Sequence, residues 1–141
     1  MKRCVACTAI LLLVSMLPAF ATVRIQNDPG GQIGRYLAKY RALRVSGQKV
    51  IIDGTCSSAC TMLLGAIDRS RICVTARAAF EFHSAWTPTP SGPEESAAGN
   101  YYLWSNYPAD VRDWINRHGG LHLQSIYLRG SDLTAMYPTC P

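Results

Sequence analysis

Short apolar runs alternate with amphipathic stretches along the chain, and glycine- or proline-rich turns separate them. Apolar residues at helical spacing predict a helix over residues 32–45 and a compact second helix over 59–67. Between and around them, short segments rich in β-branched or aromatic residues show the partial period-2 alternation of strands. These predicted strands are residues 22–26, 49–53, 71–75 and 80–83.

The second half of the chain is less regular. Residues 84–99 hold three prolines and two glycines without periodicity, which predicts a long loop, and such loops are usually functional or disordered. Pro108 fits the first turn of a helix that two glycines end. Residues 121–128 fit either a short helix or a strand, and Ser131 is a candidate cap for a final turn over 132–136.

The order of these elements predicts the fold class. Strands that alternate with helices favour an α/β layered fold with a mostly parallel sheet. The length of 141 residues allows one domain.

The first 21 residues have the three parts of a secretory signal. Lys2 and Arg3 precede an apolar run, and Ala19 and Ala21 supply the small side chains of a cleavage site. The apolar run is shorter than the roughly 20 residues that span a bilayer. We therefore expect a signal peptide over 1–21, a single mature domain over 22–141, no stable membrane span after cleavage, and a periplasmic or secreted location; a retained N-terminal anchor is the alternative.

Cleavage of the signal peptide would change the number of cysteines and the net charge of the chain. Cys4 and Cys7 would leave, and four cysteines in an exported chain predict two disulfides in one of three pairings. A zinc site competes, but the paired Cys-x-x-Cys spacing is missing, so we expect neither a metal nor a cofactor. Removal of Lys2 and Arg3 leaves 12 basic against 9 acidic residues, a net charge of +3, which is too weak to predict nucleic-acid binding. The four retained cysteines are Cys56, Cys60, Cys73 and Cys140.

Three short motifs are candidates for chemistry. Residues 54–60 (GTCSSAC) lie between a predicted strand and an apolar helix, where a serine hydroxyl would project from the sheet edge beside free helical amides. The alternative is that Ser57 or Ser58 only caps the helix. His83 ends a predicted strand and could act as a general base, or be an ordinary surface histidine. Gly30 and Gly31 open the first helix and offer bare backbone amides.

Together these motifs resemble the ClpP-type serine peptidases of the ClpP/crotonase superfamily. Residues 25–31 (IQNDPGG) are similar to the family's I-N-S-P-G-G segment, residues 54–64 (GTCSSACTMLL) to its G-x-A-A-S-M-G-x-x-L-L nucleophile turn, and residues 79–83 (AFEFH) to the strand before its catalytic histidine. The chain looks closest to small exported ClpP-like proteins with a Cys-x-Ser-Ala-Cys motif, most of them uncharacterised. The resemblance implies a reduced ClpP/crotonase-like layered fold, stabilised here by disulfides.

The resemblance also implies the roles of individual residues. Ser58 matches the nucleophile and His83 the general base, while the amides of Gly31 and Ala59 match the oxyanion hole. The triad acid is less defined: Asp132 falls near the right distance, and a Ser–His dyad or an inactive site are the alternatives. The chain is shorter than a ClpP-type subunit, and cytosolic members lack the two cysteines that flank the serine.

The resemblance therefore predicts an exported serine hydrolase, a peptidase acting by acyl transfer on a peptide or protein substrate. Two alternatives stay open: an inactive ClpP-like domain that binds a peptide or a protein partner, and a crotonase-like acyl-binding site. Assembly into homo-oligomers is a further expectation by analogy. Aromatic residues near the long loop could line a substrate groove, form an oligomer contact or complete a small core. They are Trp86, Tyr101, Tyr102, Trp104, Tyr107 and Trp114.

Overall fold

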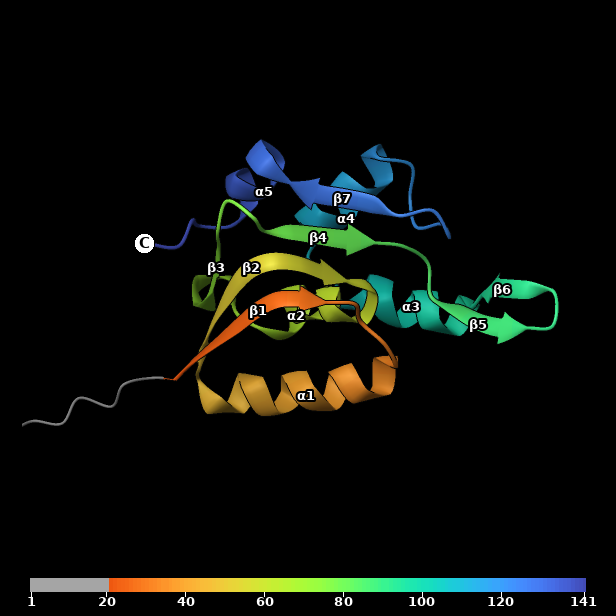
Figure 1. The fold of residues 1–141 in the computed structure, drawn as a ribbon, viewed down its shortest axis with the longest axis horizontal. Helices are drawn as coiled ribbons and strands as arrows, with labels where there is room; N and C mark the ends of the chain where they lie inside the picture. The colour runs from red at the N-terminus through yellow and green to blue at the C-terminus, as the bar shows by residue number, and fades with distance from the viewer. Residues whose placement is uncertain (1–20) are drawn as a thin grey trace, which may run out of the picture.

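The computed structural model describes residues 21–141, so the predicted signal peptide, apart from Ala21, lies outside the described residues. One five-stranded sheet, a cluster of helices and a separate two-stranded hairpin make up the described chain (Figure 1). The elements of the first part are β1 (Thr22–Asp28), α1 (Ile33–Ser46), β2 (Lys49–Ser57), a 3-10 helix (Ser58–Met62), α2 (Leu63–Ala66), a 3-10 turn (Arg69–Arg71), β3 (Ile72–Val74) and β4 (Ala79–Phe82). The later elements are β5 (Trp86–Thr89), β6 (Gly92–Glu95), α3 (Ala97–Asn106), α4 (Ala109–Arg117), β7 (Ile126–Arg129) and α5 (Gly130–Met136).

The main sheet confirms the predicted α/β class with mostly parallel pairing. Its strand order is β1-β2-β4-β7, and β3 pairs with the first half of β2. The β1–β2, β2–β3 and β2–β4 pairs are parallel, whereas β7 runs antiparallel to β4. The carboxyl ends of β1, β2 and β4 therefore meet at one edge of the sheet, which is where ligands bind in open α/β sheets.

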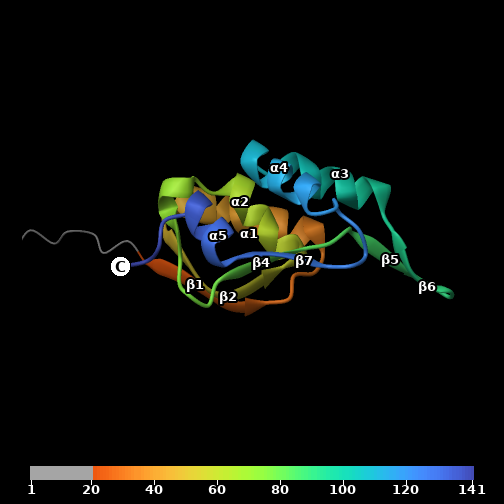
Figure 2. The same cartoon turned by 90° about the horizontal axis from the view of Figure 1, so that it is seen from above.

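The helices lie on one side of this sheet (Figure 2). Alternate strand residues point toward them and are buried, such as Val50, Ile52 and Cys56 on β2 and Phe80 and Phe82 on β4. This alternation is the period-2 pattern from which the strands were predicted.

Strand β2 continues four residues beyond the predicted end at Asp53 because Gly54 allows a close backbone approach. A Cβ atom built on Gly54 would lie 1.4 Å from the Gln26 carbonyl oxygen of β1. The pairing register shifts at this point, between Ile25 and Asn27. Gly54 is thus required inside the strand, where the sequence suggested that it closed the strand.

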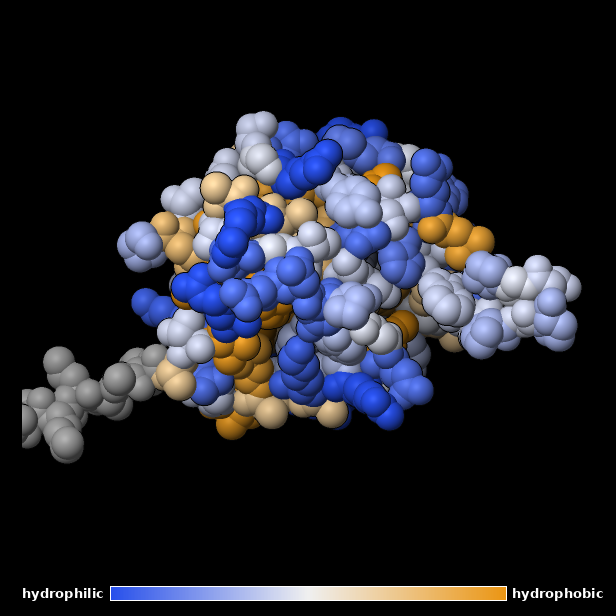
Figure 3. Space-filling model, viewed as in Figure 1, coloured by the Kyte–Doolittle hydropathy of each residue, from blue (hydrophilic) through white to orange (hydrophobic). Residues whose placement is uncertain are grey.

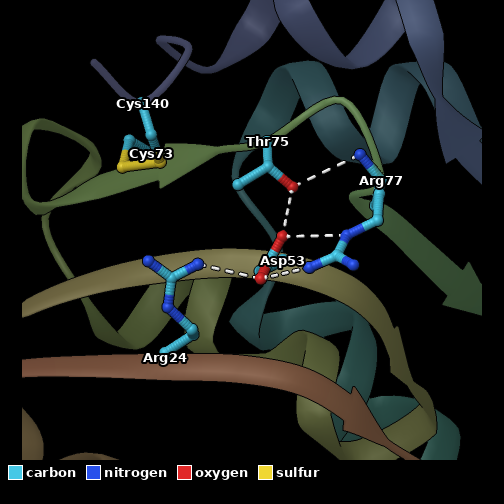
Figure 4. Close-up of polar contacts among 6 residues, drawn as sticks. All are labelled: Arg24, Asp53, Cys73, Thr75, Arg77 and Cys140. Atoms are coloured by element: carbon cyan, nitrogen blue, oxygen red, sulfur yellow. Dashed lines mark hydrogen bonds and ion pairs between the residues drawn. A yellow bond between two sulfur atoms is a disulfide. The ribbon is translucent and has the colours of Figure 1, made fainter.

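The other face of the sheet carries a polar layer (Figure 3). At its centre the Asp53 carboxylate accepts hydrogen bonds from Arg77 (2.6 Å to Nη2), from the Thr75 hydroxyl (2.8 Å) and from Arg24 (2.8 Å) (Figure 4). These bonds lower the pKa of Asp53 to about 2, and the bond from Arg77 has the largest effect. The cluster ties β1 and β2 to the connection between β3 and β4.

Two segments differ from the expectation. Residues 84–99 contain the β5–β6 hairpin and the beginning of α3. Pro88 and Pro93 lie opposite each other in this two-stranded ribbon, where both strands are edge strands and a residue without an N–H is tolerated. The hairpin projects away from the body of the molecule (Figure 2). Ser131 does not cap α5: the helix begins at Gly130, its cap position is Arg129, and no side-chain cap bond forms.

The four described cysteines form two disulfides, Cys56–Cys60 and Cys73–Cys140. The second fastens the C-terminal tail to β3, and two main-chain hydrogen bonds continue this pairing, from Val74 N–H to the Pro138 carbonyl and from Cys140 N–H to the Val74 carbonyl. Disulfides persist in oxidising compartments, so they indicate an exported environment. Among residues 21–141, no helix is long and apolar enough to cross a membrane.

Candidate functional site

A cavity of about 660 Å³ lies at the sheet edge where β1, β2 and β4 end. It brings together four of the residues singled out from the sequence: Gly30 and Gly31 from the β1–α1 loop, Ser58 from the turn after β2, and His83 from the end of β4. The base of the hairpin and the side of α3 close it, through Trp86, Pro88, Gly99 and Leu103. Three separate motifs thus converge on one volume, of the size that usually binds small ligands or peptide side chains.

Ser58 occupies a special backbone position in this cavity. It is the one non-glycine residue of the described chain with a positive φ, 54°. This conformation costs a residue with a side chain roughly 1–2 kcal/mol. It turns the chain sharply from β2 into the 3-10 helix and leaves Ser58 half-buried at the cavity, whereas Ser57 is buried.

Neither serine caps the helix. Ser57 holds the cap position but makes no side-chain cap bond; its hydroxyl donates to Glu81 Oε2 (2.5 Å) on the polar face of the sheet. A cap residue has extended backbone, which the positive φ of Ser58 does not match. The structure therefore contradicts the capping alternative for this motif.

Surrounding bonds hold the Ser58 turn in place. The Cys56–Cys60 disulfide closes a loop around it, and the Thr61 hydroxyl donates to the Ser58 carbonyl (2.6 Å). The buried Tyr107 hydroxyl bonds Thr61 in turn (2.7 Å). Burial raises the pKa of Tyr107, so its hydroxyl stays protonated, and because the Thr61 proton goes to the Ser58 carbonyl, Tyr107 donates this bond.

The Gly30–Gly31 loop packs directly on the Ser58 turn. A Cβ atom on Gly30 would lie 2.5 Å from the Ser57 carbonyl oxygen and 3.0 Å from the Ala59 nitrogen. Because Gly30 has no side chain, the glycine loop can approach the backbone of Ala59 this closely. The first amides of a helix have no partner within it, so the Ala59 N–H is available to an anion.

Asp28 anchors this glycine loop. Its carboxylate accepts hydrogen bonds from Gly30 N–H (3.0 Å), from the Tyr36 hydroxyl and from Lys39 Nζ (3.1 Å). Burial raises the pKa of Asp28, but the bonds from Tyr36, Gly30 and Lys39 outweigh it and leave the pKa below its usual value. The sequence motif did not assign Asp28 a role, although an Asp two residues before a glycine is a common turn signal.

His83 is oriented by the main chain. Its Nδ1 lies 2.8 Å from the Ser84 carbonyl oxygen, and since a carbonyl can only accept, Nδ1 donates this bond, which leaves Nε2 as the acceptor of the neutral tautomer. Ser84 is itself fixed, because its N–H donates to the His122 carbonyl (2.7 Å) and its hydroxyl to Glu95 (3.1 Å). His83 and Ser58 are not hydrogen-bonded to each other in this structure.

Asp132 is not brought to this cavity. Its carboxylate accepts a hydrogen bond from the Trp114 indole (3.0 Å). The register explains the separation: Arg129, just before α5, pairs with Ala79 at the beginning of β4, while His83 follows its other end. The contact that would make Asp132 the partner of His83 is absent.

The six aromatic residues near the site differ in burial, and Trp104 is partly buried against the core. Tyr107 and Trp114 are buried and pack against Phe82 in the core. Trp86, Tyr101 and Tyr102 remain at least half exposed, and of these Trp86 lines the cavity. Among residues 21–141, no cluster of three His, Cys, Asp or Glu side chains could hold a metal ion.

No protein-family model matches the chain, and a search of curated proteins found no match either. The functional argument therefore depends on the site itself.

Proposed function

We propose that the protein is an exported serine hydrolase, a peptidase of the ClpP type, with Ser58 as nucleophile and His83 as general base. The observation that carries the proposal is the convergence of Ser58, in its left-handed conformation, with His83 and the Gly30–Gly31 loop in one cavity. Strained backbone is concentrated at functional sites, where the surrounding structure maintains it. The parallel order β1, β2, β4 at the site is consistent with a reduced ClpP/crotonase-like layering, and a periplasmic or secreted location belongs to the same proposal.

The reaction would proceed by acyl transfer. Nε2 of His83 takes the Ser58 hydroxyl proton as Oγ bonds to the substrate carbonyl carbon, and the amides of Gly31 and Ala59 stabilise the oxyanion. The C–N bond then breaks, and His83 returns the proton to the leaving amine. Water attacks the acyl ester, gives its proton to His83, and Ser58 recovers it as the acid product leaves.

The Ser84 carbonyl would take the place of a triad acid. It fixes the same tautomer that a carboxylate would fix, which leaves Nε2 of the neutral ring as the acceptor. A neutral carbonyl stabilises the imidazolium less than a carboxylate does, so this Ser–His dyad should be slower than a full triad. Asp132 would then have no catalytic role and would only accept the hydrogen bond from Trp114.

A fluorophosphonate probe tests the proposal because it labels activated serines. Wild-type protein should be labelled, Ser58→Ala should not, and His83→Ala should be labelled at least about 100-fold more slowly. Ser57→Ala is the matched control, since Ser57 is the adjacent serine with its hydroxyl bonded to Glu81, and it should keep labelling. If wild-type protein is not labelled, or if Ser58→Ala is labelled equally, the catalytic role of Ser58 is refuted.

A peptide-binding domain without activity is the second candidate. The missing Ser58–His83 hydrogen bond and the absence of a carboxylate on His83 favour it, although catalytic hydrogen bonds are often long in ligand-free enzymes. It predicts saturable peptide binding without turnover, unchanged in Ser58→Ala. Homo-oligomers remain a prediction by analogy, which sedimentation of the purified protein would test.

A further inference from the structure

A second cavity of about 520 Å³ is also lined by His83. His83, Trp86 and Pro88 line both cavities, so the second one adjoins the site of Ser58 at the proposed general base. Its remaining walls come from β4, from the hairpin and from the segment before β7, and include Glu81, Ser125 and Leu123. The only carboxylate among the residues that line it is Glu81, and no lysine or arginine lines it.

Hydroxyl groups hold the Glu81 carboxylate rigidly at this cavity. Ser57 donates to Oε2 (2.5 Å), while Ser125 (2.7 Å) and Tyr127 (2.9 Å) donate to Oε1. Burial raises the pKa of Glu81, but the bonds from Ser57, Ser125 and Tyr127 outweigh it and keep the pKa below its usual value. Glu81 is therefore negatively charged near neutral pH.

Glu81 differs from the described carboxylates that are held in ion pairs; like Glu95 and Asp132, it is hydrogen-bonded to neutral groups. Asp28, Asp53 and Asp110 each form an ion pair with a lysine or an arginine. Within residues 21–141, Glu81 has hydroxyl partners and no lysine or arginine partner; the basic side chain whose charge acts on it is His83, which lines the same cavity. A partly buried carboxylate without a permanently charged partner in its own chain provides a binding position for an external cation.

The walls of the cavity suit the rest of such a group. Trp86, which is 51% exposed, and the prolines of the hairpin present apolar surface next to the carboxylate. Lysine and arginine side chains bury their methylene stems on such surface while the charged end reaches a carboxylate, and an indole face adds cation–π attraction.

We propose that this cavity binds a lysine or arginine side chain of the peptide substrate and makes the enzyme selective for basic residues near the scissile bond. This inference depends on the proposed peptidase function for its position next to His83. The Glu81 carboxylate would supply the charge and Trp86 the apolar wall.

A peptide library with lysine, arginine, norleucine or glutamate at each position around the scissile bond tests the inference on the full chain. At one position wild-type protein should cleave the basic peptides at least about tenfold faster than the norleucine peptide in kcat/KM. Glu81→Gln should reduce this ratio to near one. Glu94→Gln, an exposed carboxylate on the hairpin that lines neither cavity, makes the same charge change and should keep the ratio.

Ser125→Lys provides a second variant should Glu81→Gln fold poorly. The new ammonium would lie next to Glu81, occupy it from within the chain and abolish the basic preference while the carboxylate stays in place. A wild-type enzyme with no basic preference, or a preference that survives in both variants, would overturn the inference.

A binding measurement separates this inference from the proposed function. Tryptophan fluorescence of Ser58→Ala, to which Trp86 in the cavity wall contributes, should report tighter binding of a lysine peptide than of its norleucine analogue. If no peptide is cleaved but this difference appears, the peptidase proposal fails and the basic-residue site stands. If cleavage occurs and the difference is missing, the site fails while the peptidase proposal stands; if no peptide is either cleaved or bound, both fail.

Discussion

The two disulfides should make separable contributions, one to the stability of the fold and one to the site. Cys73–Cys140 closes a loop with a sequence separation of 67 residues, and Cys56–Cys60 closes one of 4 residues around Ser58. A disulfide stabilises a protein mainly by limiting the unfolded chain, and the effect grows with the length of the closed loop. The long disulfide should therefore dominate stability although it lies far from the cavity.

The loop lengths give the magnitudes. The chain-entropy relation assigns about 4 kcal/mol to a loop of 67 residues and about 2 kcal/mol to a loop of 4 residues. The double substitution Cys73→Ala/Cys140→Ala should thus lower the free energy of unfolding by about 4 kcal/mol, and Cys56→Ala/Cys60→Ala by about 2 kcal/mol. The first loss is a large fraction of the roughly 5–15 kcal/mol that stabilises a typical domain.

The effect on the site should be the reverse. Without Cys56–Cys60, the hydrogen bond from Thr61 and the contact with Gly30 alone constrain the Ser58 turn. A displacement of about 1 Å in a catalytic group can cost a factor of about 100, so fluorophosphonate labelling of Ser58 should slow by tenfold or more. The Cys73→Ala/Cys140→Ala variant, measured well below its unfolding temperature, should keep the wild-type labelling rate.

Urea unfolding, followed by tryptophan fluorescence on oxidised protein, measures the first quantity, and the labelling rate measures the second. Equal losses of stability in the two variants would refute the loop-length argument. Slower labelling in the Cys73→Ala/Cys140→Ala variant alone would refute the local role of Cys56–Cys60.

Two further predictions concern the sheet. Gly54→Ala should destabilise the protein by at least about 2 kcal/mol in urea unfolding, because its Cβ would overlap the Gln26 carbonyl and neither backbone can move away without further cost. The control is Gly34→Ala in α1, where a Cβ meets nothing within 4 Å. This variant should instead stabilise the protein by up to about 1 kcal/mol. Because the folded pKa of Asp53 is about 2, below its unfolded value, its contribution is present above about pH 4 and is lost as the pH falls toward 2. Asp53→Asn should therefore unfold more easily at neutral pH and lose less stability than wild type between pH 4 and 2, and thermal melts that fall in parallel over this range would contradict the reasoning.

Local sequence patterns predicted the elements in which the type and spacing of the side chains reflect which of them are buried. The β-branched run that includes Val50 and Ile52 identified a strand, and the period of Leu37 and Tyr40 identified α1, because burial favours these residue types and spacings. Gly54 misled the prediction of the strand end, since a glycine that stops a strand and one that admits a neighbouring backbone look identical in sequence.

The site was predictable as far as its residues follow strand ends. Ser58 and His83 were selected because their motifs resemble those of the ClpP-type peptidases, and parallel pairing of β2 with β4 places both at one edge of the sheet. Asp132 was selected by distance along the chain, and the antiparallel return of β7 carries α5 to the other end of β4. Glu81 lies on the same strand face as His83, but its hydroxyl partners come from β2 and from the segment around β7, which no local pattern shows.

The backbone at Ser58 allows a test of whether this serine is retained at a cost to the fold. At most sites glycine is less stable than alanine by roughly 0.5–1 kcal/mol, because the unfolded glycine chain has more freedom. At a φ of 54° the order should reverse, since alanine bears the left-handed penalty of roughly 1–2 kcal/mol and glycine does not. Both variants lack the hydroxyl, so their difference isolates the backbone term.

Ser58→Gly should therefore unfold at a higher urea concentration than Ser58→Ala. Its free energy of unfolding should be greater by about 1 kcal/mol. Ala38→Gly, on the exposed side of α1, is the control for the usual case in which alanine is more stable than glycine. It should lower the free energy of unfolding by about 1 kcal/mol. If Ser58→Gly is the less stable of the two, the left-handed conformation imposes no strain, and Ser58 loses the structural argument that singles it out. If Ser58→Gly is instead the more stable of the two and neither variant is labelled by the fluorophosphonate, the backbone at position 58 favours glycine. The serine side chain is then retained there for the chemistry and not for the stability of the fold.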